Sequence, residues 1–115
     1  MEMADFFWGS DKKVRRVWHE NEWWFVIEDV VLTFIDSGNV HDFVHHMRSL
    51  DPELDKWYIS RASVLEVEEF GKCKEWCTNL EGIFRLVQSI NLPKAEPFKL
   101  WLAKLGKLRV DDLKF

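Results

Sequence analysis

The spacing of apolar residues predicts most of the secondary structure of this chain. Between residues 78 and 90, apolar side chains recur three or four positions apart and so share one face of a helix: Leu80, Ile83, Phe84, Val87 and Ile90. Thr78 and Glu81 have the spacing of a capping box, so we expect the helix to begin at Thr78. The segment 91–93 ends it, because proline disfavours helical dihedral angles at the residue before it.

A second helix is predicted to begin at about Pro93, where the N–H that proline lacks is not needed. Its apolar face consists of Ala95, Phe98, Trp101, Leu102 and Leu105. Gly106 suits the position just after a helix, so we expect the helix to end there. Residues 108–115 then form a short helix, a frayed tail or the join to a further C-terminal region. The two helices would meet as a helix–turn–helix-like corner with their apolar faces inward.

Two β-prone runs near the N-terminus predict a hairpin. They are Val14–His19 and Trp23–Ile27, and the polar segment Glu20–Glu22 separates them. Before them, residues 5–8 read as a short strand or a docked arm. After them, a helix from Glu28 to about Asp36 is apolar almost all round, which indicates a buried helix.

The middle of the chain is less regular. Asn39 is suited to cap a helix whose apolar stripe is Val40, Phe43, Val44, Met47 and Leu50. Asp51-Pro52 ends that helix, and residues 57–59 are expected to form a short extended segment. Gly71 lies between two runs of similar length, which favours a second hairpin; a helix over residues 62–70 is the alternative.

These elements predict an α+β fold, in which small β-hairpins pack against a bundle of about four short α-helices. With 115 residues, of which 47% are hydrophobic, the chain forms one domain (residues 1–115) that buries a core without disulfides or metals. Seven of its residues are Trp. They predict a Trp-rich core, and the alternative is that some of them face a partner.

Charge bears on the choice of partner. The formal net charge is −4, whereas nucleic-acid-binding domains are often basic. The densest basic cluster is formed by Lys12, Lys13, Arg15 and Arg16 on the first predicted strand, where it is either a solvated strand edge or a contact for phosphate. Further candidate contacts are Arg48, Lys94, Lys99, Lys104, Lys107 and Arg109. On the predicted helix at residues 78–90, we expect Arg85 to pair with Glu81 four positions earlier.

No motif of an enzyme is present in the sequence. It lacks the glycine-rich phosphate-binding loops and the G-x-S-x-G pattern, so we expect no catalytic activity and no cofactor. His41 and His45 have the i, i+4 spacing of a helical zinc site, but no third ligand lies nearby in the sequence. Cys73 and Cys77 are expected to be reduced thiols. No apolar run approaches the roughly 18 residues that a membrane span needs.

Two blocks of sequence resemble a known family. F-R-L-V-Q-S-I-N-L-P-K-A-E-P-F-K-L-W-L-A-K-L-G (residues 84–106) is similar to the C-terminal signature of the Bro-N domain, which BRO-family proteins share with bacterial prophage antirepressors. V-R-R-V-W-H-E-N-E-W-W-F-V-I-E-D-V-V (residues 14–31) resembles its opening hairpin and first helix. The likeness runs from about Phe7 to Arg109, and residues 51–76 contribute little to it.

This resemblance implies an α+β domain that acts in DNA binding or antirepression, in a phage or prophage setting and in the cytoplasm of a bacterial cell. Our first hypothesis is a regulatory domain that binds double-stranded DNA through the basic residues named above. The second is a protein-interaction module that binds and inactivates a phage repressor, which fits the acidic total and the excess of Trp. A homodimer is compatible with both.

Overall fold

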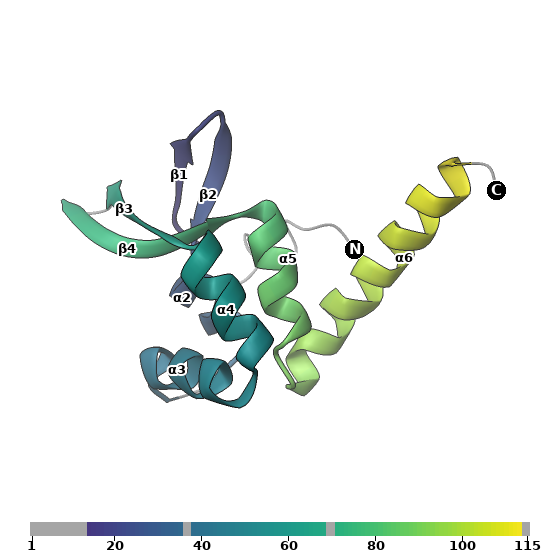
Figure 1. Ribbon diagram of the computed structural model, residues 1–115, viewed down its shortest axis with the longest axis horizontal. Coiled ribbons are helices and arrows are strands. Elements are labelled where there is room, and N and C mark those ends of the chain that lie inside the picture. Colours follow the sequence, from purple (N-terminus) through teal and green to yellow (C-terminus); the bar gives the residue numbers. More distant parts are fainter. Residues whose placement is uncertain (1–13, 36–37, 69–70, 114–115) are drawn as a thin grey trace.

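The computed structural model describes residues 14–35, 38–68 and 71–113. In chain order its elements are β1 (Arg16–His19), β2 (Glu22–Val26), α2 (Ile27–Leu32), α3 (Val40–Leu50), α4 (Pro52–Arg61), β3 (Ser63–Glu68), β4 (Lys72–Asn79), α5 (Leu80–Gln88), the 3-10 turn η1 (Pro93–Ala95) and α6 (Glu96–Asp112). The predicted α+β class is confirmed, although the described residues hold five α-helices rather than about four. Figure 1 shows the strands on one side of α4 and α5, with α6 extending on the other side.

Both predicted hairpins are present. The first turns at Glu20 and Asn21, whose φ angles of 52° and 64° are those of a two-residue turn that matches the twist of the strands. The second turns at Gly71, where φ is 120°, a value that glycine adopts without strain. Residues 63–68 are therefore a strand, and the alternative helix there is wrong.

The two hairpins join into one antiparallel sheet with the strand order β1-β2-β4-β3. Because alternate side chains point to opposite faces, neighbouring residues of β2 reach two different cores. Phe25 lies in the large core between the sheet and the helices. Val26 lies in a small cluster on the other face, which consists of Trp24, Val26, Val67 and Cys77.

The helix after the first hairpin is shorter than predicted. We expected it to run to about Asp36, but α2 ends at Leu32, where the Thr33 hydroxyl donates a 2.7 Å hydrogen bond to the carbonyl oxygen of Val30. Its predicted burial is confirmed, since Val30 and Val31 are fully buried. Asp36 lies outside the described residues.

Residues 52–61 form a helix, and the predicted extended segment at 57–59 is wrong. Asp51 ends α3 and also caps α4, because its carboxylate accepts a 3.0 Å hydrogen bond from the N–H of Leu54. Pro52 stands at the first helical position, where proline is favoured. Leu54 and Tyr58, four positions apart, are buried against the large core.

The C-terminal helices meet as predicted, but two of their boundaries differ. The cap of α5 is Asn79, whose side chain accepts a 3.0 Å hydrogen bond from the N–H of Gly82, while Thr78 is a buried residue of β4. Gly106 does not end α6, which continues to Asp112. Phe98 is fully buried, but Leu105 is 40% exposed and lies outside the core.

Candidate nucleic-acid interface

The predicted basic residues fall in separate places. Arg15 and Arg16 lie at the start of the first hairpin, and Arg48 lies on α3. The remaining cations lie on η1 and α6, away from the hairpin (Figure 1): Lys94, Lys99, Lys104, Lys107 and Arg109. Lys12 and Lys13 lie outside the described residues.

Arg15 points into the fold. Its Nε donates to Oδ2 of Asp29 at 2.7 Å and its Nη2 donates to Oδ1 at 3.0 Å, so the two groups form a bidentate ion pair. Glu75 lies 3.4 Å from Nη2. The hydrogen bonds to Asp29 raise the pKa of Arg15 above its ordinary value. Arg15 therefore joins the hairpin to α2, and its charge is compensated within the fold.

Arg16 points the other way, as expected for adjacent residues of a strand. Its guanidinium lies 4.2 Å from the centre of the Trp23 ring, a cation–π contact. Trp18, directly opposite Trp23 across the hairpin, contacts that ring edge-on at 5.1 Å. Both indoles are largely exposed, at 57% for Trp18 and 41% for Trp23. This hairpin face thus presents a cation and two aromatic rings to solvent.

A groove of about 270 Å³ runs beside these rings, and β3 and β4 complete it. Lys72 contributes a cation to its lining, and Glu66 and Glu68 contribute carboxylates. Lys72 faces Glu68, and Lys74 faces Glu66, across the second hairpin. Lys72 and Lys74 are not among the contacts predicted from the sequence. Their alternation with Cys73 and Glu75 is the signal of a strand with one exposed face.

Arg48 and Arg85 make stabilising contacts within the domain. The Nε of Arg48 donates to Asp55 at 2.7 Å, and its guanidinium lies 4.1 Å from the centre of the Tyr58 ring. Arg85 donates to the hydroxyl of Ser89 at 2.6 Å and lies 3.8 Å from Asp51. The expected pairing of Arg85 with Glu81 is therefore replaced by contacts that tie α5 to the cap of α4.

One comparison with known proteins decides the family. The sequence model of the BRO family, N-terminal domain, matches residues 13–107, which is most of the chain. The chain belongs to this family. No curated protein and no solved structure gives a significant match. Membership makes this Bro-N domain a phage-type regulatory domain.

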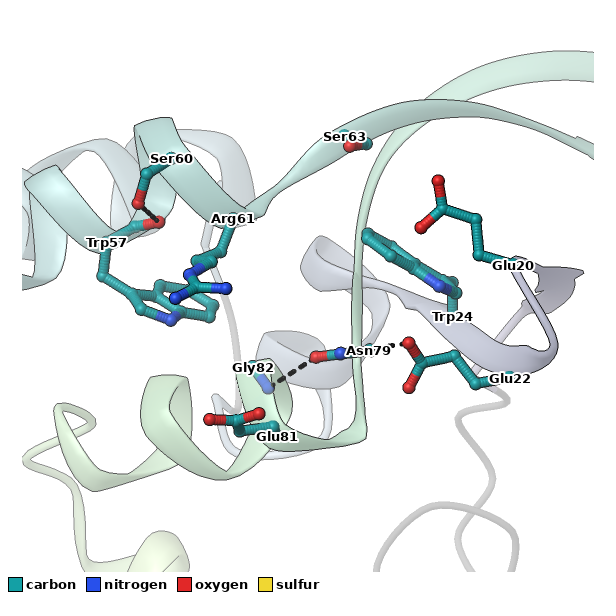
Figure 2. Close-up of a pocket in the computed structure, with 10 residues that line it drawn as sticks. All are labelled: Glu20, Glu22, Trp24, Trp57, Ser60, Arg61, Ser63, Asn79, Glu81 and Gly82. Carbon is teal, nitrogen blue, oxygen red and sulfur yellow. Dashed lines mark hydrogen bonds between the residues drawn. The ribbon is translucent and has the colours of Figure 1, made fainter.

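A second hollow in this Bro-N domain, of about 320 Å³, is acidic. Figure 2 shows Arg61 beside Trp57 on one side and Trp24 on the other. Three carboxylates surround the space, those of Glu20, Glu22 and Glu81. Because they outnumber the one arginine, the hollow disfavours phosphate, and the hairpin face is the better candidate for DNA.

The two histidines considered for metal binding, His41 and His45, both lie on α3 of the Bro-N domain. His41 is on α3 with its Nδ1 3.2 Å from a carboxylate oxygen of Glu28, and the described ranges hold no group of three or more metal-ligating side chains. Cys73 and Cys77 are free thiols on β4, and burial raises the pKa of Cys77 to about 12. Among residues 14–35, 38–68 and 71–113, no helix is long and apolar enough to span a bilayer.

Proposed function

We propose that this Bro-N domain binds double-stranded DNA as part of a phage or prophage regulatory protein, and that the outer face of the β1–β2 hairpin makes the contact. The observation that carries the proposal is the Arg16–Trp23 stack, in which an exposed ring orients a cation on a hairpin that projects from the body (Figure 1). Membership of the BRO family supports the regulatory setting.

The geometry of this hairpin suits a DNA groove. The major groove of B-DNA admits a two-stranded β-ribbon, and arginine presents a planar set of donors to guanine or to phosphate. The guanidinium carbon of Arg16 lies over the Trp23 ring, which holds this cation on the exposed face of the hairpin. Lys72 and Lys74, on the exposed face of β4, are placed to meet phosphate oxygens.

The negative net charge of the chain makes any such binding sensitive to salt concentration. A net charge of −4 repels DNA at long range, so the attraction has to come from the few cations at the contact. We therefore expect modest affinity that falls steeply as salt concentration rises.

A phage repressor is the second candidate partner, and the exposed tryptophans favour it. Trp18, Trp23 and Trp76 are each more than 40% exposed on one face of the sheet. Tryptophan is enriched at the energetic centres of protein interfaces. Binding through such rings depends little on salt, which separates the two functions.

Fluorescence anisotropy with a duplex of mixed sequence tests the DNA proposal. Replacing Arg16, Lys72 and Lys74 together with Ala should weaken binding and reduce the slope of log affinity against log salt by roughly 0.9 for each phosphate that the variant no longer binds. The control is Lys56→Ala on α4, which removes one cation whose side chain is 76% exposed and should leave the slope unchanged.

The basic cluster predicted from the sequence needs its own variant. Replacing Lys12, Lys13 and Arg16 with Ala should likewise weaken binding to all sequences alike. Unaltered affinity in both folded triple variants would refute the hairpin as the contact. If the wild-type chain binds no DNA at low salt and micromolar protein, the repressor becomes the better-supported partner.

A further inference from the structure

The C-terminal half of α6 lies outside the body of the domain. Phe98 is fully buried and Trp101 and Leu102 pack against the core, but every residue from 103 to 113 is exposed. Figure 1 shows this half of the helix extending away from the other elements. It holds large apolar side chains in water, namely Leu105, Leu108, Val110 and Leu113.

Helix propensity does little to hold this segment. Isolated helices shorter than about 12–15 residues are marginal in water. Gly106, in the middle of the segment, lowers helix stability by about 1 kcal/mol relative to alanine. A partner that covers the apolar side chains would offset both effects.

The seam of this segment follows a heptad. Leu105 lies four positions after Trp101, Leu108 lies three positions after Leu105, and Asp112 lies four positions after Leu108. This is the d-a-d-a spacing with which two helices pack side by side in a coiled coil. The positions that flank the seam carry charges: Lys104 and Asp111 at g, and Arg109 at e.

These charges distinguish the two directions of pairing. In a parallel pair, a g residue faces the e residue five positions later on the partner, which sets Lys104 against the partner's Arg109 and repels. In an antiparallel pair, g faces g, which sets Lys104 against the partner's Asp111 twice by symmetry. Neither Lys104 nor Arg109 has an ion-pair partner within the described part of the chain.

We propose that α6 pairs antiparallel with α6 of a second copy of this chain. Leu105 and Leu108 of each helix pack against those of the other, and Lys104 binds the partner's Asp111. Asp111 already holds Lys107 of its own helix at 2.6 Å, but both side chains are well exposed and a carboxylate accepts more than one donor. This pairing requires no DNA.

The seam spans only about two heptads, so the pairing should be weak. Stable interfaces usually bury about 1,600 Å² in total, and two helix ends of this length bury less. We therefore expect a dimer that dissociates on dilution. Analytical ultracentrifugation from micromolar to several hundred micromolar chain should show this equilibrium.

Two matched substitutions locate the seam. Leu108→Glu should abolish the dimer, because it places a charge at the centre of the seam, where Leu105 and Leu108 of the two helices meet. Leu100→Glu introduces the same charge on the same helix, outside the seam, and should leave the dimer intact. Leu108 is 59% exposed and Leu100 is 60% exposed, so neither change disturbs the core. Equal effects of the two changes, or a wild-type chain that stays monomeric at the highest concentration, would overturn the proposal.

Charge reversal tests the direction. Lys104→Asp should weaken an antiparallel dimer by at least tenfold, since it faces the partner's Asp111, and Asp111→Lys should do the same. An equimolar mixture of these two variants should associate again, because both contacts become attractive in the mixed dimer. Circular dichroism checks that each variant stays folded. A Lys104→Asp variant that associates more tightly than wild type would show a parallel pair and refute the assignment.

Discussion

Replacing Phe98 with Ala should destabilise the domain by about 3–5 kcal/mol, the range observed when buried aromatic side chains are truncated. Phe98 is fully buried and lies against three rings, at centroid distances of 5.9 Å to Phe34, 6.1 Å to Phe84 and 5.4 Å to Trp101. An aromatic side chain buries about 150–250 Å². At roughly 25 cal/mol per Å² that area corresponds to about 4–6 kcal/mol, an upper value because unfolded chains already bury part of it.

Urea denaturation followed by Trp fluorescence measures this change directly. The midpoint should fall while the slope with urea stays the same, because the surface exposed on unfolding hardly changes. Leu100→Ala on the same helix is the control, and as an exposed substitution it should stay within about 0.5 kcal/mol of wild type. A destabilisation below about 1 kcal/mol for Phe98→Ala would show that α6 does not pack on the core as described.

Four further results are expected. Because burial raises the pKa of Cys77 to about 12, thiol reagents at neutral pH should modify Cys73 and reach Cys77 only on unfolding. The stability that comes from keeping the Cys77 thiol neutral is complete below its ordinary pKa of 9.0 and is lost as the pH rises toward 12. Melting curves recorded over a pH series would detect this loss. Asn79→Ala removes the cap of α5 and should cost about 1 kcal/mol in urea denaturation. Gly82→Ala should cost about 1–3 kcal/mol in the same assay, since its new methyl group would lie 2.7 Å from a ring carbon of Trp57 and would also meet Thr78. We expect no structural zinc, so a chelator should leave the melting temperature unchanged, and a clear drop would refute this.

The sequence predicts elements well where one signal dominates. Two β-prone runs around a polar turn place the first hairpin, and Gly71 between two runs of similar length places the second. Asn39 marks the start of α3, where its side chain accepts a hydrogen bond from the N–H of Asp42 at 3.1 Å. At Asp51-Pro52 two signals coincide, because the residues that end one helix also start the next. We interpreted them only as an end, and α4 was missed.

Other errors arise where tertiary contacts decide. Gly106 is an exception: it resembles a helix end locally, yet α6 continues past it to Asp112 through residues that are all exposed, at a cost of about 1 kcal/mol relative to alanine. Arg15 looks like a phosphate contact in the sequence, whereas the fold brings it to Asp29, fourteen positions away. The groove beside Trp18 and Trp23 combines residues of both hairpins, and its lining follows only from the strand order.

The two separate cores of this sheet imply two levels of cooperativity. The outer part of the sheet is held by one cluster of four buried side chains, whereas the helices and the inner part of β2 share a much larger core. Segments with few buried apolar contacts open at lower free energy than the rest of a domain. Amide protons of β3 should therefore exchange with solvent through local opening, while those of α5 exchange only on global unfolding. Such local opening would let the sheet adjust its curvature to a partner while the helical body stays closed.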